Sequence, residues 1–540
     1  MNAKNLFRTS AALLAAALTL ILSGCGPEET DTPEEKPVKE YLDLLDAYER
    51  GLIFTGADNS ANAVVLHFED EADLNIPNSQ LRVHDHTASA APVVSLNSDG
   101  IWQIDGSLTG IRSSDDDDRN SLPVYVFYDK LTLHIYISNG SRIAFPHRKP
   151  KSIPTVRLYT DGKALIRDKE NYVNGSLRVE DPACIYSADT LYEGRMRIRG
   201  RGNSTWGMPK KPYKIKLDEK ASLLGMPKDK EWCLLANYSD KTLLRNITAM
   251  EVSRILDMAW TPRMRSVDVY LNDEYLGCYT LSEHKKVASK RVDIDTDAGD
   301  IYLEIEENQD EPRCFWTGMG VPIMFSDPDE PSDEVFSGTV RYFEDFEAAL
   351  RSADFADSGK GYAAYIDVDS FVNYYIIQEL VKNVDGNLRK SSFLTKSPGG
   401  KLVMYHVWDF DLALGNCDYF DAAVGNGYTG FFIKDYGSWG KNWGWYPRLF
   451  QDPAFVKKVQ ERWKEVLPQL KAVPDFIDAQ RTLLYGAEDR NFERWDILKI
   501  YVWPNAKVLG TYAAELNYLK SFYNGRLNWL NTNIMALGTY

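Results

Sequence analysis

An almost uninterrupted apolar run at residues 402–408 leads directly into the acidic sequence Asp409-Phe410-Asp411. A short apolar run without alternation is typical of a buried strand. The two carboxylates therefore follow the end of that strand. Carboxylates in this position can hold Mg²⁺ against the oxygens of a triphosphate, and the alternative is that they are ordinary strand-end acids.

A second acidic position precedes this strand. Apolar residues recur at helical spacing over residues 368–381, and Gly386 is a signal for the end of that helix. Asp385 thus lies on the loop after the helix, where a carboxylate can accept the proton of a hydroxyl group. Phosphoryl transfer uses both of these carboxylate roles. The alternative for Asp385 is that it only turns the backbone.

A glycine-rich and basic stretch lies further upstream, at residues 197–217. Its glycines, including Gly202, allow the backbone to approach an anion closely, and Ser204 can donate a hydrogen bond. The strand predicted at the end of the stretch projects Lys214 and Lys216 from one face. The combination is compatible with a phosphate site, although it is not a Walker loop. The alternative is that the two lysines are simply solvated.

A helix is predicted over residues 241–256, followed by a β-hairpin whose strands cover 267–271 and 275–281. Together with the strand that carries the two lysines, these elements give the order strand, helix, strand, strand. The sequence therefore predicts an α+β fold for this region.

A different pattern precedes this region. A short helix is predicted first, and a small all-β module follows, and we place both within residues 40–150. A proline-rich junction at 146–154 leads into a larger domain over 151–540, which carries the candidate chemistry. The module is predicted from short alternating runs between turn residues at 64–68, 81–84, 101–104 and 124–127.

The N-terminus has the features of a secretory signal, in the expected order. Lys4 and Arg8 precede an apolar run at residues 11–22 that is too short for a comfortable membrane span. The run ends in Leu22-Ser23-Gly24-Cys25, which resembles the lipobox of bacterial lipoproteins. That resemblance implies a signal peptide over 1–24 and lipidation of Cys25, with an incidental thiol as the alternative.

Residues 25–39 are rich in Pro, Glu, Asp and Thr, and this composition predicts a flexible tether. Acyl chains on Cys25 would be the membrane anchor. We therefore expect a lipid-anchored protein of the bacterial envelope, in the outer membrane, with its folded body in the periplasm or on the cell surface.

The charge balance bears on partners. The chain has 62 Lys and Arg residues against 78 Asp and Glu residues, a net charge of −16. Because phosphate-backbone binding needs a basic surface, this balance argues against nucleic acid as the principal partner. The cysteines after Cys25 form no CxxC pattern, which indicates buried apolar thiols, with one disulfide as the alternative.

Several motifs occur in one fixed order along the large domain. They are Gly200-Arg-Gly-Asn-Ser-Thr-Trp206 with Pro209-Lys-Lys-Pro-Tyr-Lys-Ile-Lys-Leu217, Trp232-Cys-Leu-Leu-Ala-Asn-Tyr-Ser-Asp240 with Leu244-Arg-Asn246, Tyr275-Leu-Gly-Cys-Tyr279, and Asn383-Val-Asp385 with Trp408-Asp-Phe-Asp411. This ordered set resembles the CotH kinase family, here in a bacterial lipoprotein of Bacteroidetes type. The resemblance covers roughly residues 190–535.

The resemblance implies an atypical protein-kinase-like fold after the β module. It also implies the use of ATP with Mg²⁺ or Mn²⁺ to phosphorylate Ser or Thr hydroxyls of a protein partner. Asp385 matches the catalytic-loop aspartate of the family, and Asp409 matches the metal-binding aspartate. Gly202 and Ser204 fall among the nucleotide-binding residues.

The resemblance also implies a strand lysine that contacts the nucleotide phosphates. We assign this role to Lys214, with Lys216 as the neighbouring candidate. Glu251, on the predicted helix 241–256, is the expected ion-pair partner of that lysine, and Glu283 after the hairpin is the alternative.

One position departs from the kinase pattern. A kinase catalytic loop commonly has Asn five residues after its Asp to bind a second metal ion, and Lys390 occupies that spacing here. Asn387 or Ser391 is the expected substitute, and we take Asn387 as the second metal ligand.

Three functions compete. The first is an ATP- and metal-dependent kinase-like transferase that acts on protein hydroxyls at the envelope. The second is a catalytically inactive binding or adhesion lipoprotein, in which Trp439, Trp443 and Trp445 would make a glycan a partner, although a buried aromatic lid is the favoured interpretation of these residues. The third is a metal-dependent phosphodiesterase, which the lack of a clustered His set disfavours.

Overall fold

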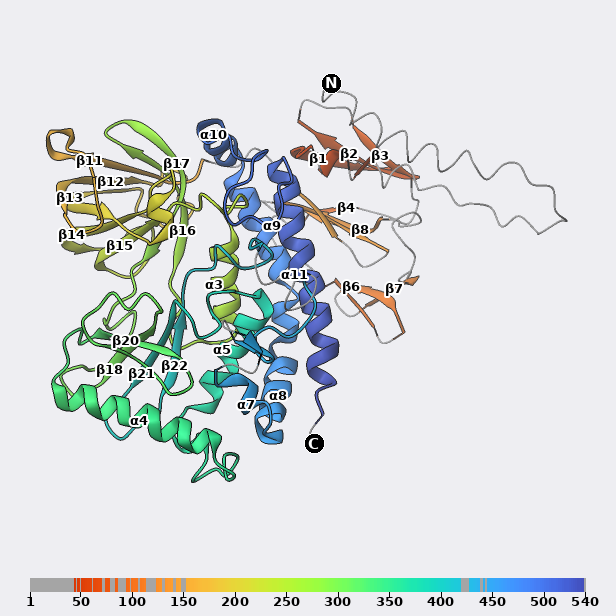
Figure 1. Ribbon diagram of the computed structural model, residues 1–540. Helices are drawn as coiled ribbons and strands as arrows, with labels where there is room; N and C mark the ends of the chain where they lie inside the picture. Colours follow the sequence, from red (N-terminus) through yellow and green to blue (C-terminus); the bar gives the residue numbers. More distant parts are fainter. Residues whose placement is uncertain are drawn as a thin grey trace, which may run out of the picture.

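The computed structural model describes residues 152–418, 427–437, 440–441 and 444–538 of the large domain. Before that domain it describes residues 43–44, 46–48, 50–60, 62–69, 73–77, 83–85, 94–97, 99–104, 107–112, 123–128, 132–138 and 142–146. Figure 1 shows a β-barrel and a second sheet on one side of a group of helices, with small sheets on the other side. The chain is therefore a mixed α+β protein, as predicted.

The N-terminal part consists of small sheets with the strand orders β1-β2-β3, β10-β9-β8-β4 and β5-β6-β7. In β2, Val64 and Leu66 alternate with half-buried residues and pack against Ile135 of β9. The prediction of an all-β module is confirmed, and residues 43–44 and 46–48 before it are helical. The strands are β1 (Phe54–Asn59), β2 (Ala63–Phe68), β3 (Leu74–Pro77), β4 (Val83–Asp85), β5 (Val94–Leu96), β6 (Ile101–Ile104), β7 (Ser107–Arg112), β8 (Pro123–Tyr128), β9 (Thr132–Ile137) and β10 (Arg142–Pro146).

The large domain begins with a closed barrel in the order β11-β12-β13-β14-β15-β17-β16. Parallel pairing of residues 155–158 with 268–271 closes it. Apolar side chains alternate along the strands and fill the interior, so that Tyr213, Ile215 and Leu217 of β14 are buried there. The strands are β11 (Thr155–Thr160), β12 (Val173–Glu180), β13 (Leu191–Gly200), β14 (Tyr213–Ala221), β15 (Asp229–Leu235), β16 (Met264–Leu271) and β17 (Glu274–Glu283).

A five-stranded sheet in the order β19-β20-β18-β21-β22 lies below the barrel in Figure 1. Helix α4 (Asp333–Arg351) packs on it, with the ring of Phe343 against that of Phe315 in β19. The predicted apolar strand is β22, in which Met404 and Val407 are fully buried. The strands are β18 (Ile301–Ile305), β19 (Cys314–Trp316), β20 (Pro322–Asp327), β21 (Ser392–Lys396) and β22 (Val403–Val407), and a separate two-stranded sheet pairs β23 (Tyr436–Gly437) with β24 (Gly440–Lys441).

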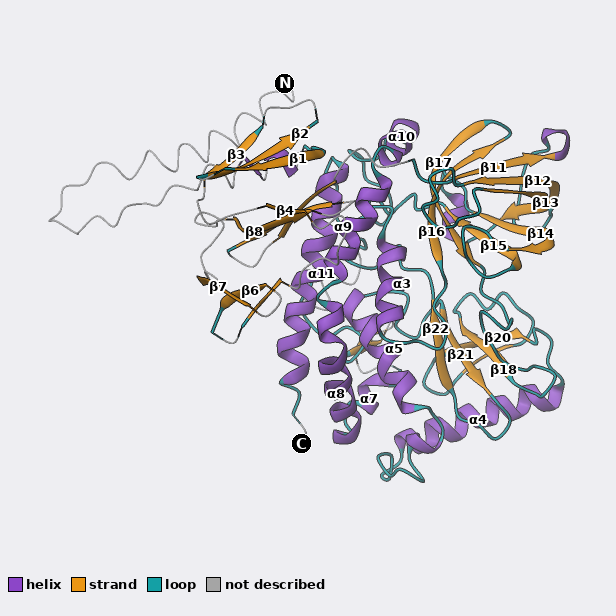
Figure 2. Ribbon diagram, turned by 180° about the vertical axis from the view of Figure 1, so that it is seen from behind, coloured by secondary structure: helices purple, strands orange, loops and turns teal. Residues whose placement is uncertain are grey.

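The remaining helices form the layer between the barrel and the N-terminal sheets, which Figure 2 shows from behind. Helix α5 spans the residues predicted for it and is buried on nearly every side. It ends before the predicted stop at Gly386, because Lys382 adopts a left-handed conformation with φ +49°. The helices are α3 (Arg245–Ile255), α5 (Val368–Val381), α7 (Tyr446–Leu449), α8 (Pro453–Leu470), α9 (Val473–Leu484), α10 (Ala487–Arg494) and α11 (Tyr512–Met535).

The N-terminal sheets are joined to these helices by an ionic cluster that is largely buried except at Asp475. Arg142 of β10 lies 2.6 Å from carboxylate oxygens of both Asp475 and Asp478 of α9. Asp478 also binds Lys520 of α11 at 2.8 Å. Burial alone would raise the pKa of Asp478, but the charges of Lys520 and Arg142 hold it below its usual value.

Other sequence predictions have mixed outcomes. Cys233, Cys278 and Cys417 are buried thiols, as predicted, whereas Cys184 is exposed and Cys314 is partly exposed. The described residues contain no helix that is long and apolar enough to cross a membrane. The signal peptide, Cys25 and the tether lie outside the described residues.

The aromatic segment packs inward where it is described. Trp445 is fully buried against Phe346, and its indole N–H donates to Glu347 at 2.9 Å. The buried-lid interpretation is therefore confirmed for Trp445. Trp439 and Trp443 lie outside the described residues.

A buried ion pair ties α11 to α5. Arg526 and Glu379 are both fully buried, and Arg526 donates to the carboxylate and to the backbone oxygen of Glu379. The same carboxylate accepts hydrogen bonds from the backbone N–H groups of Phe432 and Ile433 at 2.6 and 2.9 Å. One pair thus fixes two helices and a loop segment.

Arg526→Met is expected to lower the free energy of unfolding by about 3–5 kcal/mol, because it leaves the Glu379 charge buried without its cation. Urea unfolding followed by circular dichroism measures this change. The control is Lys457→Met, which breaks an exposed ion pair with Glu461 and should change the free energy by less than about 1 kcal/mol. Equal effects of the two substitutions would contradict the structural role of the buried pair.

Candidate active site

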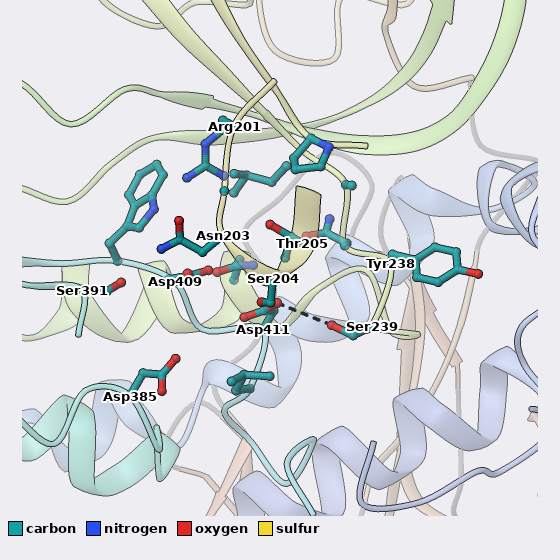
Figure 3. A pocket seen from close by; sticks show the side chains of 18 of the residues that line it. Arg201, Asn203, Ser204, Thr205, Tyr238, Ser239, Asp385, Ser391, Asp409 and Asp411 are labelled. Carbon is teal, nitrogen blue, oxygen red and sulfur yellow. Dashed lines mark hydrogen bonds between the residues drawn. The ribbon is translucent and has the colours of Figure 1, made fainter. Parts of the chain in front are cut away.

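A cavity of about 160 Å³ lies between the barrel and the five-stranded sheet. One wall is the loop of residues 201–205, which follows β13. Asp385, Asp409 and Asp411 line the same cavity. In Figure 3, Asp409 is drawn at the level of Ser204, Asp411 lies below it, and Asp385 lies furthest from the 201–205 loop.

The 201–205 loop has the close packing that its glycines permit. Gly202 has φ +81°, and a Cβ atom there would lie 2.1 Å from the hydroxyl oxygen of Thr205. A 3-10 turn at Ser204–Gly207 follows directly. Ser204 is exposed and Thr205 is half-buried, and both line the cavity. The loop therefore presents hydroxyl groups and backbone at short range.

The acidic motif is fixed by its backbone. Asp409 has a left-handed conformation with φ +65°. The N–H of Phe410 donates to the side-chain oxygen of Asn246 in α3 at 2.8 Å, and the phenyl ring is fully buried. The hydroxyl of Ser239 donates to Asp411 at 3.5 Å. These contacts place the exposed Asp409 and the half-buried Asp411 at the cavity.

The three carboxylates repel one another. Burial and the charge of Asp409 raise the pKa of Asp385 to about 6. Burial, followed by the charges of Asp409 and Asp385, holds the pKa of Asp411 well above its usual range. Adjacent carboxylates resist ionisation together, so a cation between them would be favourable.

The donor set fits a divalent cation in its chemistry. Carboxylate oxygens are the ligands that Mg²⁺ prefers in proteins, and the mutual repulsion of Asp385, Asp409 and Asp411 would be relieved by such an ion. Within the described ranges, no group of three or more His, Cys, Asp or Glu side chains is close enough together to hold a metal ion. The described residues would therefore supply only part of a coordination shell, from Asp409 and Asp411, and the remaining ligands would have to come from bound phosphate oxygens or water.

Cationic side chains that sequence reasoning missed line the cavity as well. Lys285 follows β17 and binds Glu304 of β18. Lys390 lies 3.0 Å from Glu307, and the guanidinium of Arg201 lies 5.9 Å from the ring centre of Trp408. Lys285 could have been found in the sequence from its position just after the predicted hairpin. Lys390 could have been found from its position at the spacing where a kinase has Asn.

Lys210, in the sequence Pro-Lys-Lys-Pro-Tyr, also lines the cavity but is almost fully buried. Its ammonium group donates to the backbone oxygen of Cys278 and, at 2.8 Å, to Asn491 of α10. Burial lowers the pKa of Lys210 to about 7. Because its donors are engaged inside the protein, we assign Lys210 a structural role in holding the loop to α10.

Of the residues predicted for the site, the structure brings Gly202, Ser204, Asp385 and Asp409 to one cavity. Asn387 does not line this cavity. It is buried, and its side-chain N–H donates to the backbone oxygen of Phe432 at 3.4 Å. Ser391, the second candidate, does line the cavity.

Lys214 and Lys216 do not line the cavity. They project from one face of β14, as predicted, but both reach Glu231 on the neighbouring strand β15, at 2.8 and 3.5 Å. Lys214 also contacts a ring nitrogen of His284 at 2.8 Å. Burial would raise the pKa of Glu231, but these lysines lower it to about 2.

The predicted ion-pair partner of Lys214 is also wrong. Glu251 forms an ion pair with Arg254 on α3 and lines a different cavity. Glu283, the alternative, is buried and binds Arg263 at 3.2 Å. Each of these glutamates binds an arginine, and Lys214 binds Glu231 instead of either of them.

The family model of the CotH kinase protein matches residues 198–530. The chain belongs to the CotH kinase family. The match covers the 201–205 loop, Asp385, Asp409 and the helices up to most of α11, so the CotH kinase domain contains the whole cavity. No curated protein matches the chain. Strands β11 and β12 precede the matched region, yet they are part of the closed barrel.

Asp385→Asn is expected to stabilise the protein at pH 7.5 without divalent cations. The folded-state pKa of Asp385 is raised from the ordinary 3.8 to about 6, so the free energy of unfolding falls as the pH rises through this window, by about 3 kcal/mol. Asparagine cannot ionise, so the free energy of unfolding of the variant does not fall in this way. Urea unfolding at pH 3.5 and pH 7.5 should show a stabilisation of about 2–3 kcal/mol at the higher pH only.

The control for this measurement is Asp369→Asn, which changes an exposed acid of α5 and should have little effect at either pH. Added Mg²⁺ should narrow the difference between wild type and Asp385→Asn at pH 7.5. A less stable Asp385→Asn variant at pH 7.5 would show that the carboxylate makes favourable contacts rather than repulsive ones.

Proposed function

We propose that this chain is an ATP- and metal-dependent phosphotransferase that acts on Ser or Thr hydroxyls of proteins at the bacterial envelope. The observation that carries the proposal is one cavity in which Asp385 and Asp409 face the hydroxyl-bearing loop of residues 201–205. A loop for phosphate, an acid for metal and an acid for the acceptor proton are the parts that phosphoryl transfer needs.

The nucleotide phosphates would lie between the 201–205 loop and the acidic motif. Gly202 allows close backbone approach, and Ser204 supplies a hydroxyl donor. Lys285 and Arg201 also line the cavity and supply positive charge there. A Mg²⁺ or Mn²⁺ ion held by Asp409 and Asp411 would neutralise phosphate charge. Because the cavity encloses only about 160 Å³, the rest of the nucleotide would lie in its open mouth.

Asp385 is the residue for the acceptor hydroxyl. It lies on the loop after α5, away from the 201–205 loop in Figure 3, so an acceptor would enter between the two. A general base works best when its pKa is just below the working pH, and a pKa of about 6 leaves Asp385 ionised above neutrality. Arg389, 3.9 Å from its carboxylate, adds to its positioning.

Millimolar MgATP is expected to raise the thermal midpoint of the wild-type protein by a few degrees, because a ligand that binds the folded state stabilises it. Asp409→Asn should abolish the metal-dependent part of this shift. Asn is the suitable replacement since it tolerates the positive φ of Asp409 better than Ala does. Differential scanning fluorimetry with ATP alone, Mg²⁺ alone and both together measures the effect.

Asp385→Asn separates binding from catalysis in the same assay. It should keep the MgATP shift but lower phosphate incorporation from γ-labelled ATP into the chain and into a Ser/Thr peptide library by about 10²- to 10⁴-fold. Asp369→Asn should change neither readout. No shift in the wild-type protein would instead support the catalytically inactive binding scaffold.

We also propose that the chain is anchored by lipid on Cys25, on the basis of the apolar run and the Leu-Ser-Gly-Cys sequence before it. Two acyl signals give stable membrane attachment without a spanning helix. Cys25→Ala is therefore expected to move the protein from the membrane fraction to the soluble fraction of cells, as measured by immunoblotting. Retention of the variant with membranes would exclude Cys25 as the anchor.

A further inference from the structure

A second cavity, of about 440 Å³, lies between α3, the 257–265 segment, α9 and Tyr186. It shares no lining residue with the active-site cavity. Its volume lies within the range of pockets that bind small molecules. Glu251, which the sequence suggested for the nucleotide site, is part of its wall.

Much of the wall is apolar and adaptable. Thioether side chains can fit ligands of different shape, because they are unbranched and polarisable. An apolar ligand body would therefore find a matching surface here. The apolar lining residues include Met250, Met258, Trp260, Met264 and Phe476.

The charged residues of the wall are paired, with one exception on the cationic side. Arg254 binds Glu251, and Arg263 binds the buried Glu283 behind the wall. Arg265 forms no ion pair among the described residues. It donates only to the backbone oxygens of Leu224 and Met264, at 3.3 and 2.9 Å.

Arg265 is held in place by its neighbours, although no carboxylate among the described residues contacts it directly. Its guanidinium lies 4.9 Å from the ring centre of Tyr186, which fixes its plane. The side chain is half-buried, and its second terminal nitrogen, Nη2, makes no hydrogen bond to the described residues. Burial is the main cause that lowers the pKa of Arg265; the charge of Arg263 adds to it, whereas Tyr186 and the buried Glu283 act in the opposite direction. A half-buried guanidinium that no carboxylate contacts directly still has a donor available for an anionic ligand.

A second wall residue carries an unpaired donor. Trp260 is 6% exposed, and its indole N–H is buried without a hydrogen-bond partner within the described part of the chain. Buried polar groups in native proteins are nearly always paired. Because this N–H has almost no accessible surface, it lies within the wall and is not a donor that faces the cavity.

From this arrangement, we propose that the second cavity binds an organic monocarboxylate, with the carboxylate on Arg265 and an apolar body against the methionines and Phe476. A monocarboxylate fits better than a phosphate because, among the described residues, Arg265 is the one arginine of the wall without a direct ion pair, and its planar fork matches a carboxylate. Asp257 is the other unpaired charge in the wall, and its exposed position leaves it to solvent.

Isothermal titration calorimetry of the full chain with 3-phenylpropionate, its neutral amide and acetate tests the proposal. The acid is expected to bind about tenfold or more tightly than the amide or acetate, because a charge-assisted hydrogen bond and apolar contact act together. Arg265→Gln should remove the preference for the acid. The matched control Arg254→Gln, whose arginine is already paired in the same wall, should retain it.

Two further variants make the result unambiguous. Gln480→Trp places a bulky ring in the cavity from α9 while Arg265 itself is unchanged, and it should abolish binding even if Arg265→Gln unfolds the protein. Asp409→Asn should bind the acid like wild type, since the two cavities share no residue. Absence of binding at millimolar acid, equal affinity for acid and amide, or unchanged affinity in both Arg265→Gln and Gln480→Trp would overturn the proposal.

Discussion

The acidic motif is held where it is by a buried carboxylate at the junction of the barrel and α3. Asp240 is fully buried and accepts hydrogen bonds from the hydroxyl of Thr242 at 2.6 Å and from the backbone N–H and guanidinium of Arg245 at 2.9 and 2.7 Å. The N-cap residue of α3, Leu244, has an apolar side chain that cannot accept a hydrogen bond. The carboxylate of Asp240 instead accepts one from the first backbone N–H of the helix, that of Arg245. Asn246 then follows at a fixed position and binds the backbone of Phe410. The geometry of the candidate site therefore starts from a charge that could not be buried without these donors.

Local sequence was sufficient to find Asp385 and Asp409. Each lies at the end of an element whose periodicity is visible in the sequence, namely α5 and β22. The strand before β22 is its direct neighbour β21, so the chain returns through a two-stranded antiparallel pair and brings the second acid back to the first. The pairing is short-range, which is why sequence order alone implied spatial proximity.

Local sequence was not sufficient to assign the lysine. The alternation in β14 correctly placed Lys214 and Lys216 on one face of the strand. It did not show which residues lie against that face. Glu231 lies directly opposite Lys216 across the β14–β15 pair. Cross-strand neighbours of opposite charge attract each other, so the lysines bind Glu231 and not a ligand in the cavity. Which strand edges meet the cleft depends on closure of the barrel by β11 and β16, a pairing between distant segments. The β18 sheet that brings Glu304 to Lys285 is likewise set by tertiary packing rather than by periodicity.

Helix α3 contributes residues to both cavities, and this explains why Glu251 was assigned to the wrong one. Asn246 of α3 lines the first cavity, whereas Glu251 and Arg254 one and two turns later line the second. A helix pattern identifies which residues share a face, but not which neighbour covers that face. Here the covering element is α9, whose Asp478 also receives Arg142 from the N-terminal sheets. The second cavity is thus bounded by the helix that carries the β module and by the helix that positions the acidic motif, so a ligand bound there would contact both structural supports of the candidate active site.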